Sequence, residues 1–282
     1  MNNPAIQNLI RNNLSIPTLP EVVMRVTQMM QDPDSGAAEV GAVVSEDAPI
    51  AAKVLRIANS SFYGLRGECM STEHACTVVG MRVLKNIVTQ AAVISCFEHV
   101  EDTETFRVQD LWGHASMTGH LCSKLAEKAN NIGMVEPTEL YVCGLLHDVG
   151  KVVLLDGLKK RYLRLVQRAH DQGVPQHKVE RDILGFDHTD VGVLVCTRWD
   201  LPEQITRAIQ YHHGPRRVVA VDPVVSIVAH ANLLAHAILD NEEGVEDVEA
   251  IFDEETRSLI GLTRADLDGI VSWGMNMRHV EV

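Results

Sequence analysis

The chain has 282 residues, 46% of them hydrophobic, which is enough for one large buried core or two smaller ones. Its formal net charge of −13 argues against nucleic acid as the main partner, because binding phosphate needs a clustered positive surface. Aromatic residues make up only 4% and strand-like alternation is rare, so a sheet is hard to build and an all-α protein is expected.

The first half of the chain predicts a series of short amphipathic helices. Apolar residues recur at helical spacing over residues 20–31, 36–45 and 48–58. The segment 72–96 predicts two helices that are broken near Gly80. This half carries almost no cluster of titratable residues, so we expect no chemistry in it by itself.

A polar, acidic stretch at residues 101–105 is the candidate junction of two parts. We therefore predict an N-terminal helical subdomain over residues 1–105 and a second helical domain over residues 106–282. Within the second, Asn241 begins an acidic loop, and residues 247–282 predict small terminal helices that cover the core.

The segment Gly144–Lys151 reads Gly-Leu-Leu-His-Asp-Val-Gly-Lys at the end of an apolar helix predicted over 137–149. Adjacent His and Asp side chains there are costly unless both are satisfied, and a divalent metal would satisfy both. His147 lies on the inward stripe of this helix. Asp148 follows it, just before Gly150, which we expect to end the helix.

Further polar residues fall on predicted helix faces. Asp110 and His114 are four residues apart, so both side chains can lie on one face and share a metal or a hydrogen bond. His188 begins another helix. A later helix ends at His212 and His213, with His212 on its inward face.

Residues 224–239 are apolar nearly all round, which is typical of a central buried helix. Asn232 interrupts this segment and is predicted to be a buried polar group that needs a partner. The inward histidines and carboxylates together suit iron, manganese, nickel or zinc. A hydrogen-bonded polar core without metal is the alternative.

Several motifs occur in a fixed order along the chain. They are Leu19–Val22, Ala58–Ser60 with Phe62–Gly64, Val79–Gly80, Leu84–Ile87, Leu111–His114, Gly144–Gly150, Asp187–His188 with Val191–Gly192, Trp199–Pro202 and Tyr211–His213. This order resembles the HD superfamily of metal-dependent phosphohydrolases and, more narrowly, the HDOD (HD-related output domain) family, over about residues 14–240.

The resemblance implies an all-helical protein in which an N-terminal helical subdomain packs on an HD-like helical core, followed by a C-terminal helical extension. It implies metal-ligand positions at His114, His147, Asp148, His188, His212 and His213. Asp110 matches an acidic ligand of some related cyclic-dinucleotide phosphodiesterases, and Lys151 matches a lysine that those enzymes place beside the scissile phosphate.

Two departures from the enzymes bear on activity. The enzymes have an Asp on the last core helix, at the place of Asn232, and a neutral Asn should bind a metal more weakly. The Gly-Tyr-Pro that follows the His pair in the phosphodiesterases is replaced by Gly214–Arg217. This replacement argues against hydrolysis of cyclic-di-GMP.

The resemblance implies first a bacterial signalling protein, because HDOD proteins are generally regarded as output modules of signal transduction. The length leaves no room for a receiver or kinase domain, so the chain would act on signalling proteins as a separate protein or a homodimer. The alternative is a metallophosphohydrolase that acts on a nucleotide or phosphoester. In it, metal-activated water would attack phosphorus, Asp148 would bridge two metals, and Lys151 would stabilise the phosphate charge.

The six cysteines lack a CxxC pair and indicate buried free thiols in a reducing cytoplasm. No signal peptide or long uninterrupted apolar segment is present, so we expect a cytoplasmic protein that does not bind membranes. Because buried neutral imidazoles must charge in acid, we also expect stability to fall below about pH 6.

Overall fold

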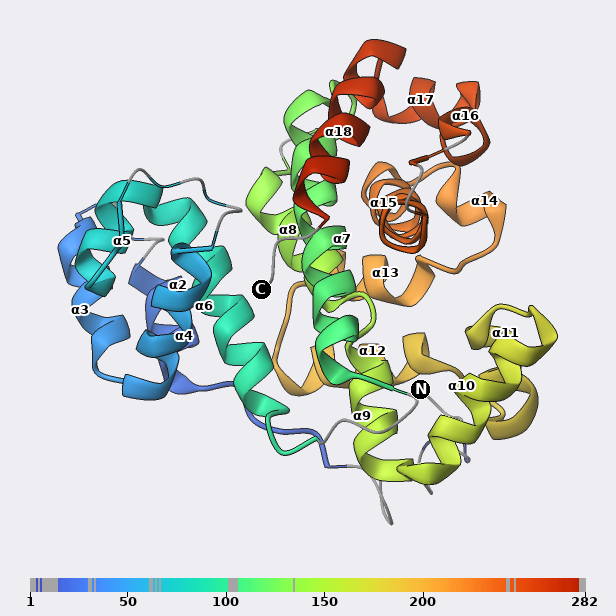
Figure 1. The fold of residues 1–282 in the computed structure, drawn as a ribbon, viewed down its shortest axis with the longest axis horizontal. Helices are drawn as coiled ribbons and strands as arrows, with labels where there is room; N and C mark the ends of the chain where they lie inside the picture. The colour runs from blue at the N-terminus through green and yellow to red at the C-terminus, as the bar shows by residue number, and fades with distance from the viewer. Residues whose placement is uncertain are drawn as a thin grey trace. The chain divides into compact units, whose positions relative to one another are not determined.

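The computed structural model describes residues 4, 6, 15–29, 32, 34–60, 63, 65, 67–100, 106–133, 135–241, 244–245 and 247–278. Every regular element in these ranges is a helix, as predicted, and none is a strand (Figure 1). The chain forms two compact units, Pro17–His99 and Val100–Met275, each with a short terminal segment. The predicted boundary between 1–105 and 106–282 stays a prediction, because residues 101–105 lie outside the described ranges.

The smaller unit contains the helices that the apolar spacing predicted. They are α2 (Glu21–Met29), α3 (Ala37–Ser45), α4 (Ala48–Ala58), α5 (Thr72–Val79) and α6 (Met81–Cys96). Gly80 separates α5 from α6 with a φ of 83°, which residues with a side chain rarely adopt. The core between these helices is aliphatic and includes Val26, Val44, Val54 and Leu84.

Asn59 closes the loop that follows α4. Its Nδ2 donates to the carbonyl of Cys69 at 2.9 Å, and its Oδ1 accepts from the Cys69 amide at 2.7 Å. One side chain thus satisfies both backbone groups of a residue ten positions away. Phe62 and Gly64, which belong to one of the predicted motifs, lie outside the described residues.

The larger unit holds the remaining helices. They are α7 (Val108–Lys128), α8 (Pro137–Leu146), α9 (Val149–Leu158), α10 (Lys160–Gln172), α11 (Gln176–Leu184), α12 (His188–Arg198), α13 (Glu203–Tyr211), α14 (Arg216–Val219), α15 (Pro223–Asp240), α16 (Val248–Ile251), α17 (Glu254–Ile260) and α18 (Arg264–Met277). The small terminal helices predicted after residue 247 are confirmed as α16, α17 and α18.

Helix α15 is the central helix that its apolar composition predicted. It packs against α7, α8 and α13, and Figure 1 shows it end-on. By length and composition it could also cross a membrane, but 61% of that window is buried inside the protein. This burial is what a core helix requires.

Two glycines allow α7 and α8 to pack in close contact. A Cβ on Gly144 would lie 2.7 Å from Gly119 Cα, and a Cβ on Gly119 would lie 2.9 Å from Tyr141 O. Neither position tolerates a side chain without a backbone shift. The close approach brings His114 on α7 within reach of His147 at the end of α8.

The predicted helix over 137–149 is wrong at its end. Helix α8 stops at Leu146, the next two residues form a turn, and α9 begins at Val149. Gly150 therefore lies inside a helix and does not end one. A Cβ there would lie 2.0 Å from His188 O, so this glycine serves the close approach of α9 to α12. The sequence pattern cannot distinguish a packing glycine from a terminating one.

Candidate metal centre

His147 and Asp148 form the turn between α8 and α9, and both side chains face the interior, at 0% and 2% exposed. His147 Nδ1 donates to Gly144 O at 2.6 Å, because a carbonyl oxygen can only accept. His147 Nε2 therefore carries the lone pair, and it lies 3.2 Å from Asp148 Oδ2.

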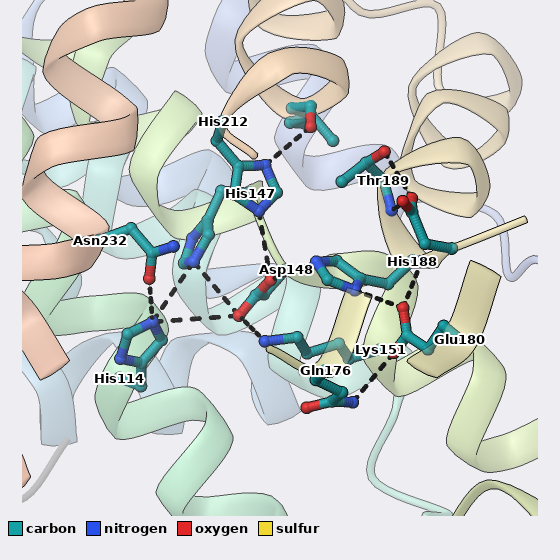
Figure 2. A network of polar contacts seen from close by, with 12 residues as sticks. His114, His147, Asp148, Lys151, Gln176, Glu180, His188, Thr189, His212 and Asn232 are labelled. Atoms are coloured by element: carbon teal, nitrogen blue, oxygen red, sulfur yellow. Dashed lines mark hydrogen bonds and ion pairs between the residues drawn. The ribbon is translucent and has the colours of Figure 1, made fainter. Parts of the chain in front are cut away.

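His188 and His212 present their Nε2 atoms to the same carboxylate. His188 Nδ1 lies 2.6 Å from Glu180 Oε2, and His212 Nδ1 lies 2.8 Å from Ile209 O. The Nε2 atoms lie 3.2 and 3.6 Å from Asp148 Oδ1, and Figure 2 shows both rings turned toward it. A ring that is anchored through Nδ1–H and offers Nε2 is the usual arrangement of a metal-binding histidine.

Three buried atoms at this point have no hydrogen-bond partner within the described part of the chain. They are Asp148 Oδ1, His188 Nε2 and His212 Nε2. An unpaired buried polar atom costs about 1–3 kcal/mol. A divalent cation placed among the three would satisfy all of them, so the residues fit a metal ion.

Asp148 belongs to two groups of potential ligands. One group is Asp148, His188, His212 and His213, and the other is His114, His147 and Asp148, with the ligand atoms of each group within 4.8 Å of one another. Since the carboxylate has two oxygens and belongs to both groups, Asp148 would be the residue common to both sets of ligands if each group held a metal ion. Imidazoles with one carboxylate suit several first-row metals, so the donor set leaves the identity of the metal open.

The protonation of most of the cluster suits a cation. Burial by itself raises the pKa of Asp148, but His147 and Lys151 hold it well below its usual range, so the carboxylate is ionised. Burial lowers the pKa of His212 to about 4 and that of His114 well below 6.5. Both rings are neutral at pH 7, which is the form that binds a metal.

His188 differs because a second carboxylate lies against it. Burial would lower its pKa, but Glu180 raises it to about 9. Burial would raise the pKa of Glu180, but His188 and Tyr162 lower it to about 2. A proton and a metal therefore compete for Nε2 of His188.

Two more of the predicted site residues, Asn232 and Lys151, lie beside the potential metal ligands. Asn232 is buried, and its Oδ1 lies 3.0 Å from His114 Nε2, from which it accepts a hydrogen bond when His114 carries its proton on that nitrogen. Lys151 Nζ lies 2.6 Å from Asp148 Oδ2. Figure 2 shows both side chains pointing into the cluster.

Asp110 is not brought to the cluster. Its side chain is 70% exposed, and its Oδ1 lies 3.9 Å from Arg107 Nη1. It lies in the first turn of α7, one turn before His114, on an exposed part of that turn, although Val108 in the same turn is buried. The four-residue spacing places the two residues on one side of the helix but does not determine how far the core extends.

Comparison with known proteins assigns the fold to a family. The HDOD domain matches residues 16–215. The chain belongs to the HDOD family. The match confirms the resemblance found in the sequence motifs, and it ends before Asn232, whereas we expected the unit to reach about residue 240.

Solved structures share the HDOD fold over almost the whole chain. An HDOD domain protein of Geobacter sulfurreducens superposes with a TM-score of 0.79 at 23% identity, covering 97% of this chain and 96% of its own. A proposed phosphohydrolase of Shewanella amazonensis gives 0.73 at 23% identity, with 97% and 93% covered. At these identities the likeness shows the fold alone.

Two further relatives are longer than this chain. A proposed signal transduction protein of Marinobacter aquaeolei has a TM-score of 0.72 at 23% identity, covering 97% of this chain and 64% of that one. An uncharacterised protein of Treponema pallidum is 26% identical over 234 residues, which are 83% of this chain and 44% of that protein. The chain therefore spans less than half the length of this relative.

Two residues that border the candidate metal centre were not predicted from the sequence, and both lie on α11. Glu180 contacts His188, and His177 stacks on His213 with ring centroids 4.3 Å apart and planes at 19°. Few apolar residues occur in α11, and nothing in the local sequence marked Glu180 or His177 as part of a buried site. Pro175 at its start and Gly185 at its end were the available signals.

Proposed function

We propose that this HDOD chain is a regulatory protein of bacterial signal transduction whose histidine-rich core binds one or two divalent metal ions. The observation that carries the proposal is the convergence of three unpaired buried atoms, on Asp148, His188 and His212. In the alternative without metal, these atoms would be left with the contacts of Asp148 Oδ1 to His188 Nε2 and His212 Nε2, at 3.2 and 3.6 Å, whereas buried polar groups in native proteins nearly always have well-formed hydrogen bonds.

The charge of the cluster favours metal binding in a regulatory role over catalysis. Asn232 stands at the place where the related enzymes have an Asp, and it brings an amide of zero charge. The Lys151 ammonium already lies on the Asp148 carboxylate, at 2.6 Å. A single carboxylate, partly neutralised, leaves two divalent cations poorly compensated, so a second ion would bind weakly.

The proposed regulatory function also implies which partners the chain has and where in the cell it acts. A regulatory HDOD protein would act by binding other signalling proteins in the cytoplasm, as a separate chain or a homodimer. The likeness to a proposed signal transduction protein of Marinobacter aquaeolei supports this role. Light scattering during size-exclusion chromatography measures the oligomeric state directly, and a monomer at all concentrations would remove the homodimer from the proposal.

The metal centre is tested by mass spectrometry of protein purified without an affinity tag or chelator. We expect one or two metal ions per chain in the wild type and none in the double variant His147→Ala/Asp148→Ala. The matched control is His170→Ala/Asp171→Ala, which removes an adjacent His-Asp pair from the surface, where the side chains are 84% and 63% exposed. A wild type that takes up no metal from manganese, iron or zinc solutions would contradict the proposal.

A second candidate function is phosphoester hydrolysis, and one observation favours it. A cavity of about 410 Å³ adjoins the cluster, with His212, His213 and Asn232 in its lining and Arg216 among its other residues. This volume suits a small organic phosphate. A bound metal would supply the Lewis acid that activates water. In this candidate function Lys151, whose ammonium lies 2.6 Å from Asp148 Oδ2, would stabilise the developing phosphate charge.

Hydrolysis is tested with the metal-loaded chain. Substrates are p-nitrophenyl phosphate, nucleoside monophosphates and cyclic dinucleotides, and Asp148→Ala serves as the inactive reference. Turnover that requires Asp148 would support the enzyme. Full metal occupancy without turnover on any of these substrates would leave the regulatory function as the better account.

A further inference from the structure

Glu180 places a second carboxylate directly behind the ligand set. Its side chain comes from α11 and is 0% exposed. Its Oε2 accepts two hydrogen bonds, from the His188 backbone amide at 2.8 Å and from His188 Nδ1 at 2.6 Å. One oxygen atom therefore fixes both the start of α12 and the orientation of the His188 ring.

The other carboxylate oxygen of Glu180, Oε1, also accepts two hydrogen bonds. Tyr162 donates its hydroxyl proton to Oε1 at 2.6 Å, and Gln176 Nε2 donates to the same oxygen at 2.9 Å. Four donors thus surround one buried carboxylate, which cannot rotate without losing hydrogen bonds. Figure 2 shows Glu180 on one side of the His188 ring and Asp148 on the other.

We propose that Glu180 is a positioning residue that makes His188 a ligand through Nε2 and supplies the metal centre with a second negative charge. Nδ1–H is committed to Glu180, so Nε2 is the ring atom left for a metal, and it lies 3.2 Å from Asp148 Oδ1. This inference rests on the proposed metal centre.

A carboxylate behind a metal-bound imidazole makes the ring a more basic ligand and fixes its tautomer. Removing such a partner typically lowers metal affinity by about 10–100-fold. A role confined to packing α11 against α12 predicts a different result: the loss of Glu180 would lower the stability of the fold and leave the metal affinity of the folded chain unchanged.

The test is titration of the full chain with Co²⁺, followed by its visible absorption and by competition with a chelator. Glu180→Gln should bind Co²⁺ about 10–100-fold more weakly and alter the absorption spectrum. Tyr162→Phe is the matched control, since it removes a hydrogen bond to the carboxylate but keeps its charge and both bonds to His188. Wild-type affinity and spectrum in folded Glu180→Gln would overturn the inference.

A measurement on the wild type covers the case in which Glu180→Gln does not fold. Nitrogen-15 NMR of the zinc-loaded chain should show His188 protonated on Nδ1 and bound to zinc through Nε2. Zinc on Nδ1 would overturn the inference while leaving the metal centre intact. A wild type that binds neither Co²⁺ nor Zn²⁺ would overturn the metal centre itself and this inference with it.

Discussion

Lys151 Nζ lies 2.6 Å from Asp148 Oδ2, on the carboxylate that both groups of potential ligands share. The lysine side chain is 12% exposed and the aspartate 1%. The ammonium therefore occupies the position of a cation in the metal-free cluster. It stabilises the buried carboxylate there, and it opposes any metal ion that approaches the same oxygen.

Replacing Lys151 should affect folding and metal binding in opposite directions. Lys151→Gln removes the lysine cation that lies 2.6 Å from the buried Asp148 carboxylate, so the metal-free chain should lose about 3–5 kcal/mol of stability. The same variant should bind a divalent metal about tenfold more tightly, because a repelling charge is gone. Urea unfolding in chelator and Zn²⁺ competition measure the two effects, and Lys159→Gln on the surface is the control. Unchanged or weaker metal binding in Lys151→Gln would contradict this account.

Restoring a carboxylate at residue 232 should strengthen the metal centre. Asn232→Asp places a negative charge beside His114 Nε2, now 3.0 Å from the amide oxygen, so metal affinity should rise by about tenfold or more. Asn86→Asp, at another buried amide, controls for the general effect of a buried acid. If chelator competition gives the same affinity for Asn232→Asp and wild type, Asn232 is not adjacent to the bound metal.

The contact between α7 and α8 predicts opposite effects for two glycine substitutions. Gly144→Ala should destabilise the fold by about 1–3 kcal/mol, because its Cβ would lie 2.7 Å from backbone. Gly113→Ala, on α7 where a Cβ would meet nothing within 4 Å, should be neutral or add up to about 1 kcal/mol through helix propensity. Thermal unfolding measures the change in stability of both variants. If Gly144→Ala is as stable as Gly113→Ala, the contact between α7 and α8 does not limit the size of residue 144.

Stability should fall in mild acid partly because of His120, a buried residue outside the metal cluster. Burial lowers its pKa to about 3, although Nδ1 donates to Ser116 O at 2.8 Å. The unfolded chain takes up this proton below about pH 6.5 and the folded chain does not. The stabilisation is therefore complete above pH 6.5 and is lost as pH falls toward 3, by about 2 kcal/mol at pH 5.

Urea unfolding in chelator at pH 7.5 and pH 5 tests the contribution of His120. The variant His120→Gln should lose about 2 kcal/mol less than the wild type between the two pH values. His170→Gln, at an exposed histidine, should keep the wild-type pH dependence. Parallel losses in wild type and His120→Gln would assign the acid sensitivity to the other buried histidines.

Much of the candidate site could be predicted from the sequence because its ligands lie at strong local signals. His147 and Asp148 follow an apolar helix, and His212 ends another on its inward stripe. The sequence did not predict how deeply each side chain is buried or which residues from other helices lie beside it. Asp110 shares a helix side with His114 yet stays in solvent, and Glu180 lies on a mostly polar helix whose local sequence does not mark it as buried. The burial of a side chain depends on which other helices cover it, and one helix's own sequence does not contain that information.

The amino-acid sequence by itself determined the all-helical class, most helix positions, the HDOD family and the residue types able to hold a metal, since each depends on periodicity or short motifs. Tertiary packing decided the rest. It brought Gly150 against α12, and it assembled Asp148, His188 and His212 from three separate segments. The charge and tautomer of a buried group depend on atoms a few ångströms away, and these come from parts of the chain that only the fold brings together.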